Sequence, residues 1–273
     1  MMRRAVRAMP AVVRGTAGAM IAYAAGQWLL RERRPGSVER VAHRGGAATA
    51  PENTLAAFRA AARAGVRSWE LDVQRTRDGT LVVFHDETLD RTSTGHGPLR
   101  SASYAELRKL DAGSWFGPAW AGEPIPTLAE VVDLAQAEGA RLLIELKSPA
   151  LYPGIERQVV DLLARTGFGP HTLILSFDAA ALARVHALDP TLVTDLNYVG
   201  HLFTPLPRVP GLRAIGPEWR LLAANPARVR LAHAAGRRVY AWTANSPRAV
   251  AFLNAIGVDG IISDRLDLLA GAD

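Results

Sequence analysis

The sequence predicts an α/β protein, a (β/α)8 TIM barrel with a small subdomain inserted after the second strand and its hairpin. From residue 37 onward, short runs of β-branched and other apolar residues alternate with helical stretches rich in Ala and Leu. The runs are apolar at successive positions, which is typical of parallel strands covered by helices on both faces. Repeated units of this kind in a chain of 273 residues fit one barrel domain, which we expect over 37–273.

Nine segments have the composition of strands, one more than a barrel of eight needs. Helices are expected between most of them, such as 53–65 and 127–139, each of which ends on a glycine. The nine expected strands are 39–43, 68–73, 81–85, 141–146, 172–177, 192–198, 213–217, 238–243 and 260–264.

The third of these strands is explained by a hairpin. Too few residues separate 68–73 from 81–85 for a parallel crossover, and Asp78-Gly79 between them is a strong two-residue turn signal. Antiparallel pairing about that turn would set Asp72 opposite His85. We therefore expect the second strand to extend past the barrel and fold back, which brings His85 beside Asp72.

The segment 87–126 breaks the alternation of strands and helices. It is rich in Gly, Ser, Pro and aromatic residues and contains one expected short helix, 104–110. We expect it to form an inserted subdomain above the end of the barrel where active sites lie. Its aromatic residues are interpreted as a small core rather than as a wall for the substrate: Trp115, Phe116 and Trp120.

The positive charge of the chain lies in an N-terminal extension, residues 1–36. Residues 1–34 hold seven arginines and one acid, whereas the rest has 25 basic and 25 acidic residues, so nucleic acid is not an expected partner. The apolar stretch 15–30 is too short to span a bilayer. Three interpretations remain open: a disordered extension, an anchor on a membrane surface, and a cleaved signal peptide. We expect a cytoplasmic protein, with membrane-surface contact through 1–34 as the alternative and secretion as the least favoured case.

Three carboxylates follow the expected strands at the barrel end where chemistry takes place. Glu70 and Asp72 share one face of the second strand because they are two residues apart, and Glu145 ends the strand 141–146. Clustered carboxylates repel one another unless a proton or a cation intervenes. The chain has no cysteine, and three hard oxygen ligands suit Ca²⁺ or Mg²⁺ better than Zn²⁺. The sequence therefore predicts a divalent metal site.

Basic side chains occupy the same strand ends. Arg44 and Lys147 offer the cationic donors that a phosphate requires. His43 and His85 come from different strands, so they can act as a general acid and a general base on the two sides of one phosphorus atom. These residues together predict metal-assisted phosphoryl transfer or phosphodiester cleavage.

Several motifs of the chain resemble those of the glycerophosphodiester phosphodiesterase family, from about Val41 to Leu269. They are HRGGAATAPENT, ELDVQRTRDGTLVVFHDETLDRTSTGHG, IELK, VYAWTAN and GVDGIISD, in that order. The resemblance implies a (β/α)8 barrel with an inserted subdomain and a small-molecule glycerophosphodiester substrate.

The resemblance also implies a role for each matching residue. His43 and His85 match the catalytic pair, and Arg44 and Lys147 match the phosphate contacts. The metal ligands, for Ca²⁺ or Mg²⁺, would be Glu70, Asp72 and Glu145. Phe177 and Trp242 match aromatic residues of the pocket, and Glu52 matches a group at the metal edge or behind the ligands.

The implied reaction starts when one histidine takes a proton from the glycerol 2-hydroxyl, which attacks phosphorus while the other histidine protonates the departing alcohol. Water then opens the cyclic glycerol phosphate with the roles reversed, to give glycerol 3-phosphate. Which histidine is the acid stays open at this point. Two alternatives are kept: a lysophospholipase D or sphingomyelinase D-like hydrolase that acts on lysophospholipids, and a barrel that binds glycerophosphodiesters without cleaving them.

One motif departs from the family. The last one, often Thr-Asp followed closely by Pro, reads Ser263-Asp264-Arg265-Leu266 here. We expect this change to loosen the final turn without touching a catalytic position.

Overall fold

The structure is a computed structural model that describes residues 38–200 and 208–270. The expected extension, residues 1–36, lies outside the described residues, as do 201–207 and 271–273. Among the helices of the described part, none combines the length and apolar character needed to cross a bilayer.

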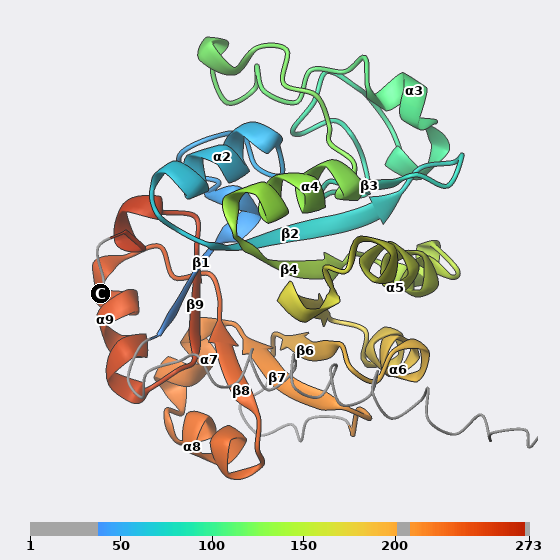
Figure 1. Cartoon of the computed structure of the whole chain (residues 1–273). Coiled ribbons are helices and arrows are strands. Elements are labelled where there is room, and N and C mark those ends of the chain that lie inside the picture. Colours follow the sequence, from blue (N-terminus) through green and yellow to red (C-terminus); the bar gives the residue numbers. More distant parts are fainter. Residues whose placement is uncertain (1–37, 201–207, 271–273) are drawn as a thin grey trace, which may run out of the picture.

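Eight parallel strands of the described chain form a closed barrel (Figure 1), as the sequence predicts. The sheet closes because β1 pairs with both β2 and β9. All nine expected strands are confirmed, the ninth being the antiparallel β3 (Leu81–Val83) on the edge of β2. The barrel strands are β1 (Glu39–Ala42), β2 (Ser68–Arg75), β4 (Arg141–Leu146), β5 (Thr172–Ser176), β6 (Val193–Tyr198), β7 (Leu212–Pro217), β8 (Arg238–Ala241) and β9 (Gly260–Ser263).

Helices cover the outside of the barrel (Figure 1). The α-helices are α2 (Leu55–Arg63), α4 (Leu128–Glu138), α5 (Ile155–Thr166), α6 (Ala179–Leu188), α7 (Trp219–Ala224), α8 (Ala227–Ala234) and α9 (Pro247–Ile256). Short 3-10 turns are η2 (His43–Gly45), η5 (Pro149–Leu151), η6 (Gly169–His171) and η7 (Leu266–Leu268). The larger core lies between helices and strands, and a smaller one fills the barrel with residues such as Val41, Leu143 and Tyr240.

The hairpin forms as expected, but its predicted register is wrong by one residue. Val73 lies opposite Val83, and the residue that meets Asp72 is Phe84, whose N–H donates to the Asp72 carbonyl at 2.9 Å. A two-residue type I′ turn needs positive φ at both central residues. In this loop Gly79 has that conformation and Asp78 does not. Instead, the Asp78 carboxylate accepts hydrogen bonds from Thr76 Oγ1 and the Tyr104 N–H, and the loop has three residues.

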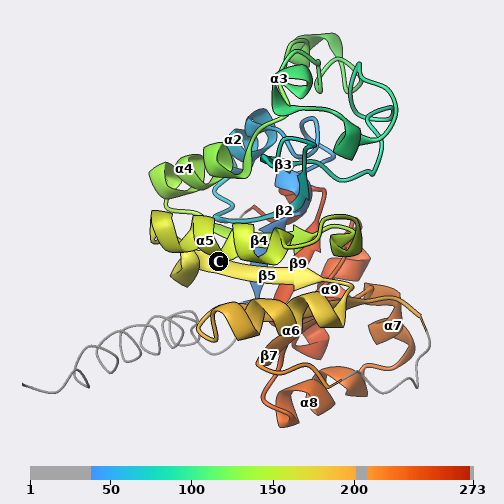
Figure 2. The same ribbon diagram turned by 90° about the vertical axis from the view of Figure 1, so that its right-hand side faces the viewer.

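The segment between β3 and α4 lies beside the barrel at the top of both views (Figures 1 and 2). It contains η3 (Leu99–Ser101), α3 (Tyr104–Leu107) and η4 (Pro118–Trp120). Helix α3 is shorter than the expected 104–110 because Lys109 and Leu110 donate to carbonyls three residues back, which tightens the last turn.

The core of this segment is mostly aliphatic, so the interpretation of its aromatic residues as that core was wrong. Phe116 contacts both Trp115 and Trp120 edge to face, Trp115 is 40% exposed, and Trp120 packs against the main core. The residues that fill the core of the segment are Val82, Phe84, Leu89, Leu99, Leu107, Ala112 and Ile125.

Candidate active site

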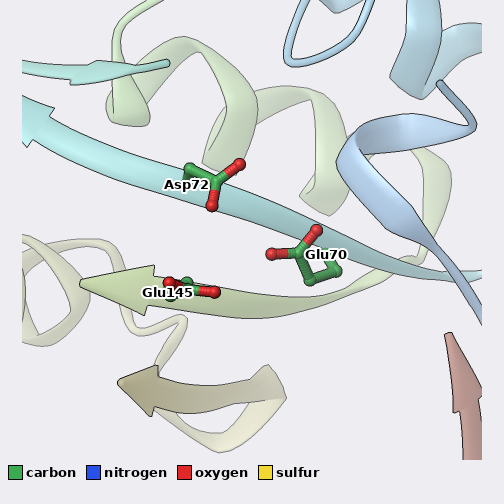
Figure 3. Close-up of side chains that lie close together, drawn as sticks. All are labelled: Glu70, Asp72 and Glu145. Atoms are coloured by element: carbon green, nitrogen blue, oxygen red, sulfur yellow. The ribbon is translucent and has the colours of Figure 1, made fainter. Parts of the chain in front are cut away.

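Three carboxylates from two adjacent strands form the acidic centre of the site (Figure 3). The parallel register of β2 and β4 sets Asp72 beside Glu145, and Glu70 lies two residues earlier on the same face of β2. One oxygen from each carboxylate lies within 4.8 Å of those of the other two, and all three residues are buried. Burial, reinforced by the Asp72 charge, raises the pKa of Glu70 to about 8. A divalent cation would relieve this repulsion, so the donor set fits a divalent metal ion that prefers oxygen ligands.

Two buried amides and one backbone amide orient these carboxylates. The side-chain N–H of Asn53 donates to Asp72 at 2.8 Å, and the Asp72 N–H donates back to Asn53 Oδ1 at 3.3 Å. Asn197 on β6 donates to Glu145 at 3.2 Å. The backbone N–H of Arg44 donates to Glu70 at 2.9 Å. Each acid therefore accepts at least one hydrogen bond that orients it.

Two cationic side chains contact carboxylates of the acidic centre. The Arg44 guanidinium donates to Glu52 at 2.7 Å, and its Nε lies 3.4 Å from Asp72. Lys147 Nζ is 2.8 Å from Glu145 and 3.8 Å from Asp72. Although burial opposes their charge, these carboxylates raise the pKa of both basic groups. Both stay charged and partly exposed toward the cavity, as an anion site requires.

The β1–α2 loop holds Arg44 in place through an unusual backbone path. Arg44 and Asn53 have φ of 51° and 60°, and Gly45 and Gly46 also have positive φ. A Cβ on Gly46 would lie 2.7 Å from Leu266, so glycine allows the loop to pack against the segment that follows β9. Glu52, from the same loop, contacts Arg44 and Arg91. These arginines outweigh the effect of its burial and lower the pKa of Glu52.

Each of the two predicted histidines is paired with a carboxylate. His43 Nδ1 lies 2.6 Å from Asp264 Oδ1, and His43 Nε2 lies 3.8 Å from Glu70. His85 Nδ1 lies 2.6 Å from Asp86 Oδ1. A carboxylate at Nδ1 favours the tautomer that carries the proton there, which leaves Nε2 for a ligand in the cavity.

The two imidazoles have opposite pKa shifts. Burial opposes the charge on His43, but Glu70 and Asp264 outweigh it and raise the pKa of His43. Burial, together with the charges of Arg44 and Lys147, lowers the pKa of His85 despite the opposing effects of Asp72 and Asp86. Groups whose pKa values are moved apart in this way suit an acid and a base in one reaction.

These groups converge on one cavity of about 240 Å³ at the carboxyl ends of the strands. Phe177 and Trp242 form its apolar wall, with their rings edge to face and their centroids 5.6 Å apart. Trp242 is anchored by a hydrogen bond of 2.7 Å from its Nε1 to the Gly216 carbonyl. Glu52 and Asp72 do not line the cavity, but both contact Arg44, which does. The other eight predicted site residues line it: His43, Arg44, Glu70, His85, Glu145, Lys147, Phe177 and Trp242.

Asp264, which the last motif keeps despite its departure from the family, contacts a predicted catalytic residue. Asp264 accepts from His43, and Asn245 in the AWTAN motif donates its side-chain N–H to the other Asp264 oxygen. The Asp264 N–H donates back to Asn245 at 2.9 Å. Sequence reasoning gave neither residue a role, since their approach to His43 depends on the closure of β9 onto β1.

Asp86 and Gln74 were also given no role by sequence reasoning. Gln74 is fully buried, and its side-chain amide donates to the carbonyls of Phe84 and Asp86, at 2.9 and 2.6 Å, on the two sides of His85. Tyr152 donates its hydroxyl to Gln74 Oε1 at 2.7 Å. Three residues thus fix the backbone and the ring of His85. The only sign of this role in the sequence was that Gln74 is a polar residue in a strand expected to be buried.

The chain is similar in sequence and in structure to phosphodiesterases of known family. Residues 43–268 match the model of the glycerophosphoryl diester phosphodiesterase family. The glycerophosphodiester phosphodiesterase of Caldanaerobacter subterraneus subsp. tengcongensis is 38% identical over 225 residues, which are 82% of this chain and 93% of that protein. The enzyme of that name from Bacillus subtilis is 33% identical, over 86% of each chain.

Solved structures of phosphodiesterases are also similar to this chain. The Oleispira antarctica phosphodiesterase in complex with sn-glycerol-3-phosphate has a TM-score of 0.75 and 31% identity, and the match covers 84% of this chain and 94% of that one. The glycerophosphodiester phosphodiesterase of Agrobacterium tumefaciens also has a TM-score of 0.75, with 29% identity over 86% of this chain and all of that one.

Proposed function

The chain belongs to the glycerophosphoryl diester phosphodiesterase family and is an enzyme of that class, and on this premise we propose that it hydrolyses glycerophosphodiesters to glycerol 3-phosphate and an alcohol. One observation carries the proposal. Two members of a cluster of three carboxylates, two cationic groups and two carboxylate-paired histidines line a single small cavity. The product held by the Oleispira phosphodiesterase supports the same substrate class.

In this proposal Arg44 and Lys147 bind the phosphoryl oxygens, since both donors face the cavity beside the acidic centre. Glu70, Asp72 and Glu145 would hold a Ca²⁺ or Mg²⁺ ion. When bound, that ion supplies positive charge to neutralise the carboxylates and the charge that develops on the phosphoryl oxygens. Phe177 and Trp242 contact the carbon skeleton of the substrate.

We assign different roles to the two histidines, and the opposite directions of their pKa shifts support this assignment. In this assignment His85, whose pKa is lowered, takes the proton of the attacking glycerol 2-hydroxyl at Nε2. His43, whose pKa is raised, gives its Nε2 proton to the oxygen of the departing alcohol. The new P–O bond closes a cyclic glycerol phosphate as the bond to the alcohol breaks. Water then opens the ring: His43 takes a proton from water, and His85 returns one to the 2-hydroxyl.

The cavity between the histidines suits a phosphate with a small alcohol, and a second hollow of about 550 Å³ adjoins it at Glu145, Lys147 and Phe177. The volume of the first cavity, about 240 Å³, is below the usual range of sites that enclose drug-sized ligands. An acyl chain would therefore have to lie outside it. The paired histidines argue against a barrel that only binds, because binding alone does not require an imidazole with a fixed tautomer on each side of the ligand.

Parallel assays of glycerophosphocholine and lysophosphatidylcholine test this function. We expect release of glycerol 3-phosphate from the first substrate and at most slight turnover of the second. His43→Ala and His85→Ala should each reduce the rate at least a hundredfold, on the scale of general acid–base catalysis. His96→Ala is the matched control, since His96 is highly exposed and pairs with Asp90 away from the cavity. Turnover of lysophosphatidylcholine alone, or full activity of both histidine variants, would overturn the proposal.

A further inference from the structure

Arg91 connects two carboxylates of the site. It lies in the segment between β3 and α4, and its side chain is 45% exposed. Its Nε and Nη2 donate to the two oxygens of Asp86 at 2.6 and 2.9 Å. Its Nη1 and Nη2 donate to the two oxygens of Glu52 at 2.9 and 2.8 Å. One guanidinium therefore makes two bidentate pairs, the geometry in which arginine binds carboxylates most specifically.

Each carboxylate held by Arg91 contacts a second residue of the site. Asp86 Oδ1 accepts from His85 Nδ1 at 2.6 Å. Glu52 Oε1 accepts from Arg44 Nη1 at 2.7 Å. Because Glu52 is itself buried and held by Arg44, it is a rigid anchor for Arg91. Asp86 is the more exposed of the two carboxylates, with a side chain 26% accessible.

Without Arg91, Asp86 would keep one partner and could turn toward solvent. Asp86 and Glu52, which both face the Arg91 guanidinium, would also repel each other in its absence. The hydrogen bonds from Arg91, followed by that from His85, lower the pKa of Asp86 to about 2, so this acid stays ionised as an acceptor. The backbone around His85 is fixed separately by Gln74. Loss of Arg91 would therefore free the side chains of Asp86 and His85 and leave the backbone in place.

We propose that Arg91 is a positioning residue for His85: it clamps Asp86 against His85 Nδ1, using Glu52 as its anchor, and so keeps the proton on Nδ1 and Nε2 toward the cavity. The tautomer follows from the hydrogen bonds alone. The effect on rate rests on the proposed function.

The tautomer is measured by ¹⁵N NMR of the full-length protein labelled at histidine, under metal-free conditions at a pH where His85 is neutral. Wild type should give His85 one protonated and one bare ring nitrogen, assigned by comparison with His85→Ala. In Arg91→Ala the two shifts should approach each other, because the tautomers exchange. Unchanged His85 shifts in Arg91→Ala would overturn the proposal, whatever the substrate of the enzyme.

Steady-state kinetics test the effect of Arg91 on the reaction rate. Arg91→Ala should lower kcat about tenfold to a hundredfold with little change in KM, since it displaces a reacting group. Arg91→Lys, which retains the charge, should recover part of the loss. In an Asp86→Asn background, Arg91→Ala should cost no more than about a further twofold. An equal loss in both backgrounds would show that Arg91 does not act through Asp86 and would overturn the proposal.

Arg77→Ala is the matched control. Arg77 also connects the β2–β3 hairpin to the following segment, through the Ser101 carbonyl at 2.6 Å and Glu106 at 3.2 Å, but it lies outside the cavity wall. Its removal should leave kcat and the His85 shifts unchanged. Thermal unfolding of each variant identifies any that is not folded, and Arg91→Lys then replaces Arg91→Ala in both measurements.

Discussion

His43 and Asp264 are 221 residues apart in the chain, yet His43 Nδ1 lies 2.6 Å from Asp264 Oδ1. The pairing of β1 with β9 produces this contact, because Ala42 lies beside Ser263 and the next residue of each strand is a member of the pair. The same closure that completes the barrel therefore completes the first half of the proposed acid–base pair.

Asp264→Asn should shift the alkaline limb of the pH–rate profile to lower pH. The hydrogen bond to Asp264 helps to raise the pKa of His43, so its loss lowers that pKa. If His43 is the general acid, activity falls as His43 loses its proton, and the variant loses activity at lower pH than wild type. The pH dependence of kcat/KM measures this, and an alkaline limb that stays in place would contradict the assignment of His43 as acid.

Binding of Mg²⁺ or Ca²⁺ should release a proton near neutral pH. The pKa of Glu70 is raised to about 8 without metal, so Glu70 is mostly protonated at pH 7 and mostly ionised at pH 9. A cation needs the carboxylate, so metal binding at pH 7 must displace that proton and should become tighter as the pH rises toward 8. Calorimetry in two buffers of different ionisation enthalpy counts the protons. Equal proton release at pH 7 and pH 9 would contradict this account of Glu70.

Gly46→Ala should destabilise the protein more than an alanine at a glycine of similar φ in open space. A Cβ at Gly46 would meet Leu266 at 2.7 Å, whereas one at Gly122 would meet nothing within 4 Å, and both residues have positive φ. We expect Gly46→Ala to cost about 2 kcal/mol more than Gly122→Ala in urea unfolding, the scale of an overpacked contact. Equal costs would mean that the loop has room to adjust at Leu266.

Gln74→Ala should reduce both stability and kcat. It leaves the carbonyls of Phe84 and Asp86 without a buried donor, at a cost of about 1–3 kcal/mol, and it loosens the backbone that carries His85. Gln136→Ala is the matched control, because Gln136 also donates to a backbone carbonyl, that of Thr166, but on the exposed surface. Urea unfolding and steady-state kinetics of both variants check this. A Gln74→Ala protein with wild-type kcat would contradict the role given to Gln74.

The sequence was enough to locate the strands and the residue types of the site. Parallel strands of a barrel are apolar on both faces, so each forms a recognisable run, and the polar residues that interrupt these runs are concentrated at one end. The spacing of Glu70 and Asp72 on one strand and the position of Glu145 at the end of another therefore predicted the acidic cluster that the structure contains.

The partners of the histidines could not be predicted in the same way. The contact of His43 with Asp264 depends on the register of β9 against β1, which no local pattern specifies. The position of His85 depends on a turn whose length was set by hydrogen bonds to the Asp78 side chain rather than by the Asp-Gly pair. Arg91 belongs to a segment without regular periodicity, and its two carboxylate partners lie on either side of β2 in sequence.

In the proposed mechanism one cavity combines a divalent cation, a phosphate clamp and a histidine pair to cleave a glycerophosphodiester. The most direct measurement is the release of glycerol 3-phosphate from glycerophosphocholine by chelator-stripped protein as Mg²⁺ or Ca²⁺ is added back. We expect negligible release before addition, saturable recovery with either or both ions, and no recovery in Asp72→Asn or Glu145→Gln. Full activity of the stripped wild-type protein, or undiminished recovery in both carboxylate variants, would contradict the account.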